Sequence, residues 1–490
     1  MTHARMKPAR MKHAQIKHAA IKHAQIKHAL LRTVDAVGST VIGLSAGYLA
    51  LAMGAGLLEL RRQRAALRVQ GDTSYGRPHL GRRDHHHLYV LVPCLNEESV
   101  IGTTVSGLLG PRTTVVVVDD GSDDATGAVA EQAGSAARAA GEQGEVTVLR
   151  REMPNARQGK GEALNHAIRV VRERVTARGQ DPSHTVVCVM DADGRLSDRA
   201  LSHVMPLFDD PRVGGVQLGV RIRNRRANFL TWFQDYQFWA MAAVTQFGRN
   251  LTRTVSLGGN GQFTRLSALD ALGERPWSQS LTEDLDLAIS LAVRGWRLRT
   301  TAHASVDQQG VSDLRRLVRQ RTRWYQGHMT AIGRMGEIWH APRMGHLAAL
   351  EMFAYLLVPW ALDLPWSLLF QYCLYFFLRS PDVLVLRGKP ATAINETCLR
   401  LPLNLLAWYL LAFAPALLTS CTYLRRDKTV GLPRALLLGH SFVVMNYMSF
   451  LCAWKALFRM LRGQTGWTKT SREVEGVGVE AVARGVPSSA

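Results

Sequence analysis

Apolar residues are concentrated in two parts of the chain. Long apolar stretches cover residues 34–60 and much of 347–461, whereas residues 61–342 contain none long enough to cross about 30 Å of hydrocarbon. In this middle part, short valine-rich runs alternate with segments of helical periodicity. The pattern excludes a purely soluble protein and predicts a large soluble domain between membrane-spanning helices.

Changes in composition mark the expected segment boundaries. We predict a basic repetitive tail that is disordered (1–33), a transmembrane helix (34–60), a juxtamembrane linker (61–87), a soluble domain (88–312), interfacial amphipathic helices (313–346), three or four transmembrane helices (347–462) and a polar tail (463–490). The tail repeats every five residues, which matches neither the period of a helix nor that of a strand. Pro359, Asp363 and Pro365 interrupt the second apolar region, so the number of spans there stays open.

The soluble domain has the pattern of an α/β fold. Apolar runs at 88–93, 113–119, 145–150 and 184–190 are each followed by a helical segment. Near-continuous valine runs are typical of parallel strands that are buried on both faces of a sheet. We therefore expect a doubly wound α/β sheet, inserted between transmembrane α-helices, with its ligand beyond the carboxyl ends of the strands.

The composition narrows the class of ligand. A net charge of +21 and a pI near 10.3 favour an anionic partner, such as a lipid headgroup or a nucleotide diphosphate. The sequence contains no zinc-finger spacing and no RNA-binding aromatic signature, so we expect no nucleic acid. The six cysteines form no CxxC pair, which argues against a disulfide framework and against a structural metal site.

Acidic residues stand where two of the predicted strands end. Asp119 and Asp120 can accept hydrogen bonds from a nucleobase or ribose, although DDGS is also a good turn sequence. Asp191 and Asp193 are hard oxygen ligands one residue apart, and they suit a Mg²⁺ or Mn²⁺ ion that also binds a diphosphate. Lys160 lies between two glycines at the start of a helix, a position that favours phosphate.

Two further motifs lie closer to the second apolar region. Glu283 and Asp284 precede an apolar helix, where they can serve as a helix cap or as acid–base groups. The sequence QRTRW (320–324) belongs to a strongly basic amphipathic stretch. Such helices usually lie at a membrane surface, and this one directly precedes the spans.

Taken in order, DDGS, DAD, TED and QRTRW resemble the motifs of the membrane-embedded processive family-2 glycosyltransferases, the group of cellulose, chitin and hyaluronan synthases. The resemblance covers about residues 88–324 by motif and the flanking spans by architecture. It implies that the soluble domain is a cytosolic nucleotide-sugar-binding domain of the glycosyltransferase A type. The stretch LGGNGQFTR (257–265) departs from the cysteine- or phenylalanine-bearing versions of that family, which leaves the acceptor and the linkage open.

The resemblance also implies roles for individual residues. The catalytic group is Glu283, Asp284 and Arg323, with Asp284 as the general base and Arg323 beside the leaving diphosphate. The implied UDP-sugar-binding residues are Asp119, Asp120, Lys160, Asp191 and Gln320; the implied acceptor-binding residues are Gly259, Asn260 and Trp324; and the implied metal ligands are Asp191 and Asp193. The implied cofactor is Mg²⁺ or Mn²⁺.

These expectations combine into one functional prediction. The protein is expected to be a multi-pass plasma-membrane enzyme that transfers a hexose with inversion from a UDP-sugar, with UDP-glucose favoured over UDP-N-acetylglucosamine. Its expected partners are the donor, the lipid bilayer and a growing β-linked polysaccharide that is exported through the enzyme's own spans. One alternative is a non-processive enzyme that adds a single sugar to a membrane lipid. A second alternative is a catalytically inactive basic membrane scaffold.

Overall fold

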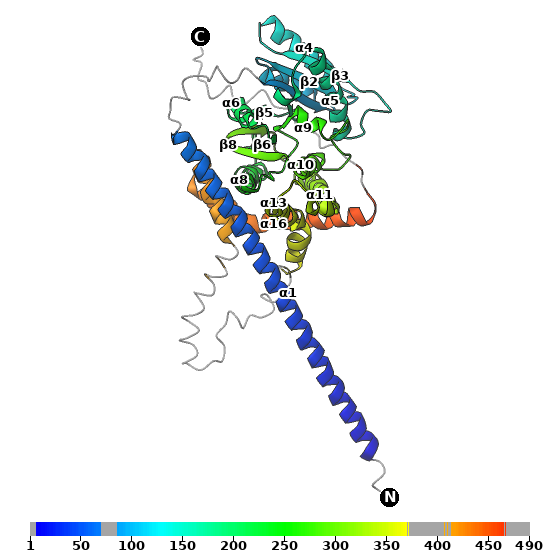
Figure 1. Cartoon of the computed structure of the whole chain (residues 1–490). Helices are drawn as coiled ribbons and strands as arrows, with labels where there is room; N and C mark the ends of the chain where they lie inside the picture. The colour runs from blue at the N-terminus through cyan, green and yellow to red at the C-terminus, as the bar shows by residue number, and fades with distance from the viewer. Residues whose placement is uncertain are drawn as a thin grey trace, which may run out of the picture.

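A computed structural model describes residues 6–69, 86–369 and 413–464, together with residues 371, 406, 409 and 466. A long N-terminal helix, α1 (Met6–Val69), precedes an α/β domain that begins at β1 (His87–Cys94). In Figure 1, α1 passes the domain beside α8 (Ala243–Thr252) and its N-terminal part extends away from it. The chain after the domain returns to long apolar helices.

The core of the domain is one mixed sheet. Its eight strands lie in the order β3-β2-β1-β4-β7-β6-β8-β5. The remaining strands are β2 (Thr113–Asp119), β3 (Glu145–Arg150), β4 (Thr185–Val189), β5 (Arg195–Leu196), β6 (Val213–Ile222), β7 (Gln262–Arg265) and β8 (Arg297–Gln308). β3, β2, β1 and β4 are parallel neighbours, as the valine runs predict. β7 is antiparallel to both β4 and β6, and β5 is antiparallel to β8.

Helices cover both faces of the sheet, which confirms the predicted α/β architecture. One core joins the sheet to α5 (Lys160–Ala177), α9 (Leu266–Asp270) and α10 (Glu283–Val293). A second core on the other face includes α3 (Glu98–Leu108), α4 (Thr126–Ala139), α6 (Ala200–Val204) and the 3₁₀ helix η3 (Met205–Asp209). A further 3₁₀ helix, η2 (Pro182–His184), leads into β4.

A continuous helical stretch follows β6. It consists of α7 (Phe229–Asp235), the π-helix η4 (Tyr236–Ala242) and α8. α8 crosses α1 at two glycines: a Cβ on Gly56 would clash with the backbone oxygen of Val244, and a Cβ on Gly248 would lie 2.9 Å from the Ala52 oxygen. The domain is therefore packed directly against the apolar part of α1.

The last helices join the domain to the membrane region. They are α11 (Leu314–Thr330), η5 (Ala331–Arg334), α12 (Met335–Trp339), α13 (His346–Leu357), the π-helix η6 (Val358–Asp363) and α16 (Leu432–Leu461). Residues 364–369 and 413–426 are also helical. Leu317 of α11 packs against Met448 and Cys452 of α16, on the side of the domain from which α1 extends (Figure 1).

Three helices within the described residues are long and apolar enough to cross a membrane. They are Ala36–Ala66, His346–Leu369 and Leu432–Leu461. The first and third overlap the predicted spans, and the second carries Pro359, Asp363 and Pro365 without ending at them. Within the region predicted to hold three or four spans, residues 370–412 lie outside the described residues except for 371, 406 and 409, as do residues 467–490 of the predicted polar tail.

The disordered tail predicted for residues 1–33 is corrected by the structure, because the chain is helical from Met6. Alanine and lysine, both good helix formers, are the commonest of these residues, followed by histidine, and after Pro8 no proline or glycine interrupts the sequence before Gly38. Good helix formers can sustain a helix even where the apolar positions do not form one stripe. The predicted linker at 61–87 is likewise shorter, since α1 continues to Val69.

Candidate active site

A cavity of about 580 Å³ lies between the ends of the parallel strands and the helices that follow the sheet along the chain. We call it the active-site cavity. Strand-end residues line one end of it, α10 and α11 form its walls, and residues of the span at 346–369 line the other end. Its lining includes Asp120, Lys160, Asp191, Gly258, Glu283, Asp284, Gln320, Arg321, Arg323, Trp324, Tyr325, His328, Tyr355, Pro359 and Asp363.

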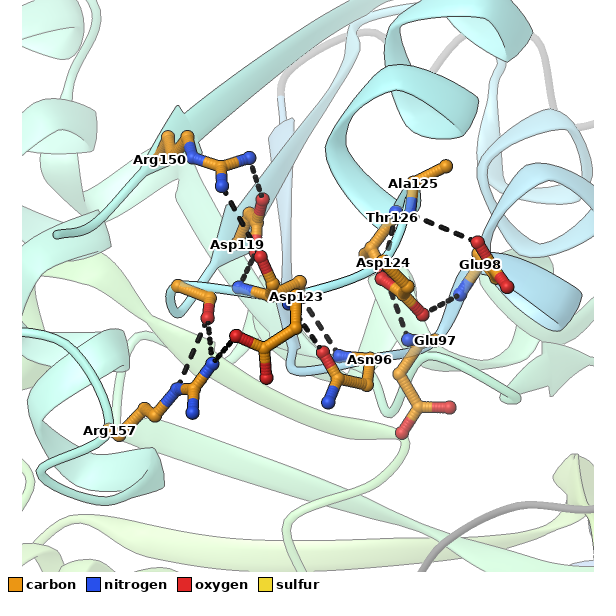
Figure 2. Close-up of polar contacts among 12 residues, drawn as sticks. Asn96, Glu97, Glu98, Asp119, Asp123, Asp124, Ala125, Thr126, Arg150 and Arg157 are labelled. Atoms are coloured by element: carbon orange, nitrogen blue, oxygen red, sulfur yellow. Dashed lines mark hydrogen bonds and ion pairs between the residues drawn. The ribbon is translucent and has the colours of Figure 1, made fainter.

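The loop after β2 is fixed by a network of hydrogen bonds (Figure 2). The buried Asp119 carboxylate accepts hydrogen bonds from the Ser122 amide, at 2.8 Å, and from Arg150, at 3.1 Å. The Asp123 amide donates to Asn96 Oδ1 at 2.8 Å, which joins this loop to the end of β1. Asp119 is absent from the cavity lining and its carboxylate instead holds the loop in shape.

Asp120 is the member of the pair that lines the cavity. Its carboxylate forms an ion pair with Arg151, which comes from the end of the neighbouring strand β3. Burial raises the pKa of Asp120 above its ordinary value, although the charge of Arg151 opposes this effect. The structure therefore distinguishes the two carboxylates: Asp120 lines the cavity and Asp119 does not.

Lys160 lies at the first position of α5 and extends into the cavity. Its ammonium group is 2.7 Å from Asp191 Oδ1 and donates a hydrogen bond of 2.8 Å to the Gly259 carbonyl. Burial favours the neutral amine, but the charges of Asp191 and Glu283 outweigh it and raise the pKa of Lys160. The side chain is thus a fixed positive charge among carboxylates.

Gly259 is required by both conformation and space. Its φ of +69° lies in the left-handed region, and a Cβ there would be 3.0 Å from Asp284 Oδ2 and 3.2 Å from Lys160 Nζ. The next residue, Asn260, is buried and accepts a hydrogen bond from the Asp191 amide at 3.1 Å. Asn260 therefore positions Asp191, while its own side chain is outside the cavity lining.

Asp191 and Asp193 differ in their access to the cavity. Asp191 lines it, whereas Asp193 is 1% exposed and accepts a hydrogen bond of 2.7 Å from the Gln309 amide. Among the described residues, no three His, Cys, Asp or Glu side chains lie close enough together to hold a metal on their own. The carboxylate pair still fits Mg²⁺ or Mn²⁺, because these ions commonly combine one or two carboxylates with phosphate oxygens and water.

Glu283 and Asp284 lie in the first turn of α10 and both line the cavity. Asp284 Oδ1 accepts a hydrogen bond of 2.7 Å from the Leu285 amide. Burial, together with the neighbouring charge of Asp284, raises the pKa of Glu283 to about 7. Burial also raises the pKa of Asp284, against the influence of Lys160. A carboxylate pair with raised pKa values in a cavity is the arrangement expected of a general base.

This arrangement predicts a pH dependence. The two carboxylates are neighbours and titrate together, so kcat/KM should rise with pH through an apparent pKa of about 7, the value for Glu283. Replacing Glu283 by glutamine removes this titration and leaves Asp284 as the only ionisable carboxylate of the pair, so the acid limb should move to lower pH. Initial rates measured between about pH 5 and 9 test this prediction, and an unshifted limb in E283Q contradicts it.

The QRTRW sequence forms part of the cavity wall. Gln320, Arg321, Arg323 and Trp324 all line the cavity from α11. The Trp324 ring packs edge to face against Phe238 at 6.1 Å, and the Arg321 guanidinium carbon lies 4.7 Å from its centroid. Trp324 is thereby held by aromatic and cationic neighbours, one of which, Arg321, the sequence analysis did not single out.

The residues at the other end of the cavity were not predicted from the sequence as site residues. Tyr325, His328, Tyr355 and Asp363 line it, from α11 and from the span at 346–369. One signal was available, because His328 follows Trp324 by four residues and therefore shares its helix face. The other was Asp363, an acidic residue within an apolar stretch.

The comparison with protein families agrees with the site. Residues 85–327 match the family model described as glycosyltransferase like family 2, and this range contains the strand-end carboxylates, the Glu283–Asp284 pair and QRTRW. These residues form a family-2 glycosyltransferase domain. The domain spans the sheet, α10 and most of α11, and its relatives are glycosyltransferases of more than one kind.

Three known proteins are informative. A β-monoglucosyldiacylglycerol synthase from Synechocystis is 33% identical over 283 residues, which are 56% of this chain and 54% of the relative. A poly-β-1,6-N-acetyl-D-glucosamine synthase from Staphylococcus aureus is 24% identical over 242 residues, 48% of this chain and 53% of the relative. A solved mannosyltransferase from Pyrobaculum calidifontis, in complex with GDP-mannose and Mn²⁺, aligns with 86% of this chain and 99% of its own at 18% identity and a TM-score of 0.49. The chain spans about half the length of the curated relatives it matches.

Proposed function

We propose that this protein transfers a single hexose from a UDP-sugar to a hydroxyl group of a neutral membrane lipid, with inversion at the sugar. The observation that carries this proposal is the active-site cavity, which reaches from the strand-end carboxylates to residues of an apolar span. A lipid acceptor in the bilayer can therefore meet a water-soluble donor in one cavity. UDP-glucose is the favoured donor and UDP-N-acetylglucosamine the second.

Sequence similarity supports the lipid acceptor. The Synechocystis relative named for glucosylation of diacylglycerol is 33% identical, whereas the relative named for a polysaccharide is 24% identical. Both matches cover about half of this chain. The alternative that adds one sugar to a lipid is accordingly favoured over the polysaccharide synthase predicted from the motifs alone.

The residues of the cavity suit each step of the transfer. Asp284 accepts the proton of the lipid hydroxyl while that oxygen attacks the anomeric carbon from the face opposite the diphosphate. Glu283, the neighbouring carboxyl group, adjusts the pKa of Asp284. Lys160 and Arg323 supply positive charge where UDP leaves. A divalent metal held by Asp191 and Asp193 would neutralise further diphosphate charge. One displacement converts an α-linked donor into a β-linked product.

The remaining site residues bind and orient the substrates. Asp120 faces the nucleotide end of the cavity, and Asp119 holds the loop that carries it. Gln320 lines the wall beside the diphosphate, and Trp324 offers an aromatic face to the acceptor. Because UDP-sugars are cytosolic, we place the catalytic domain on the cytosolic side of a multi-pass protein of the plasma membrane.

A processive polysaccharide synthase is the second candidate. It is supported by the similarity to the poly-β-1,6-N-acetyl-D-glucosamine synthase and by the position of Trp324 in the cavity wall. In that case the same base and the same cations would act repeatedly, and the product would leave through the spans.

The dependence of UDP release on the acceptor tests the proposal. Purified protein with Mn²⁺ and UDP-glucose should release UDP at least about tenfold faster with vesicles that contain diacylglycerol than with vesicles of phosphatidylcholine alone, because transfer then competes with slow hydrolysis. UDP-N-acetylglucosamine is compared in parallel. Stimulation by soluble glucan oligosaccharides but not by diacylglycerol would favour the polysaccharide synthase.

A further inference from the structure

The span at 346–369 contains two acidic residues, and they have different surroundings. Glu351 is neutralised by Arg249, whose Nε lies 2.8 Å from Glu351 Oε1. Asp363 lines the active-site cavity instead, and in the part of the chain that the structure describes it has no basic side chain at ion-pair distance. A carboxylate in an apolar helix is costly, so one without a cation calls for a ligand.

Asp363 is presented to the cavity by local backbone geometry. It is the last residue of the π-helix η6, which interrupts the helical span directly after α13. Insertions of this kind are rare and frequently occur at functional sites, because the wider turn redirects a side chain. Pro359 of the same π-helix also lines the cavity.

The neighbours of Asp363 provide complementary hydrogen-bonding groups. Tyr325 of α11 lines the same cavity, and it packs against the cluster that contains Leu364, the residue that follows Asp363. The Arg249 guanidinium stacks on the Tyr355 ring, with its carbon 3.9 Å from the ring centroid. His328 Nε2 lies 2.9 Å from the Tyr355 carbonyl oxygen. Arg249 and His328 are therefore already engaged with Tyr355, whereas Asp363 and Tyr325 both line the cavity in which a ligand would lie.

From this arrangement we propose that Asp363 and Tyr325 bind the polar headgroup of the acceptor at the membrane end of the active-site cavity. The carboxylate accepts a hydrogen bond from an acceptor hydroxyl, and the phenol donates one to a neighbouring ester or ether oxygen. Because the Asp363 carboxylate has no basic side chain at ion-pair distance among the described residues, this end of the cavity disfavours anionic headgroups and takes neutral glycerolipids. This inference rests on the proposed function and names the residues that select its acceptor.

The test separates acceptor binding from donor chemistry. We expect D363N to raise the KM for diacylglycerol about tenfold or more, since a hydrogen bond to a charged group is lost, and Y325F to raise it by less. The KM for UDP-glucose and the slow hydrolysis of UDP-glucose without lipid should stay within about twofold of the parent. S449A is the matched control: Ser449 lies beside Tyr325 but does not line the cavity, so the KM of this variant for the acceptor should not change.

Two results would overturn the inference. One is an unchanged acceptor KM in D363N, and the other is an equal loss of hydrolysis and transfer, which indicates a structural role. Failure of the proposed function looks different, because the parent protein itself would then glycosylate no lipid. Soluble, correctly sized D363N protein in detergent establishes that the variant is folded before the kinetics are compared.

Discussion

Replacing Asp284 by asparagine is expected to lower turnover by about a hundredfold or more, as for the loss of a positioned general base. Asparagine keeps the size of the side chain and can still accept the hydrogen bond that the Leu285 amide donates to Oδ1. It cannot take the proton of the acceptor hydroxyl. Because the nucleotide contacts remain, the affinity for UDP should change by no more than about twofold.

Asp286 provides a matched control on the same helix. It also lies in the first turn of α10, but its carboxylate pairs with Arg334 at 2.7 Å and is outside the lining of the active-site cavity. D286N should therefore retain most of the turnover of the parent. Equal turnover in D284N and the parent, measured with saturating donor and acceptor, contradicts the assignment of Asp284 as the base.

The second large effect is expected from Asp191. In D191A, the affinity for UDP in the presence of Mn²⁺ should fall by at least about tenfold, to the value measured with a chelator, because the carboxylate that faces the cavity is lost. Lys160 also loses its partner at 2.7 Å, but that pair is partly exposed, so its loss should cost little stability. Calorimetric titration with UDP, with Mn²⁺ and with EDTA, measures the effect.

The control for this experiment is Asp123, a carboxylate on the neighbouring loop. It pairs with Arg157 on the surface and does not line the cavity, so D123A should keep the metal dependence of UDP binding. If D191A binds UDP as tightly as the parent and responds equally to Mn²⁺, the proposed metal site is wrong.

Much of the donor side of the site could be predicted from the sequence. The carboxyl ends of parallel strands meet at one edge of a sheet, so Asp120 after β2 and Asp191 after β4 had to lie at the same edge, on either side of β1. Lys160 and the acidic pair at 283–284 stand at the starts of helices that follow the sheet edge, so their place beside the site could be predicted in the same way. The sequence pattern could not show that Asp120 lines the cavity and Asp119 does not. The orientation of the two side chains depends on their ion pairs with Arg150, at the end of β3, and with Arg151, directly after it.

The acceptor side was harder to predict because it depends on packing between distant segments. Asp363 joins the cavity only through a π-helix and through the contact of its span with α11, and neither follows from hydropathy. The antiparallel strand β7 is four residues long and was not predicted for the same reason: its place is decided by its neighbours β4 and β6. Residues 6–33 are helical because most of them are good helix formers. The five-residue repeat, which matches no helical period, led to the wrong prediction of disorder for these residues.

The number of sugars on the product tests the central claim most directly. The purified parent protein is incubated with UDP-glucose and Mn²⁺ in vesicles that contain diacylglycerol, and the extracted lipids are analysed by mass spectrometry at low donor conversion. We expect one product, diacylglycerol that carries a single hexose and whose anomeric proton has the coupling constant of a β-linkage. A ladder of polymer lengths, or polymer that forms equally well without diacylglycerol, would contradict it.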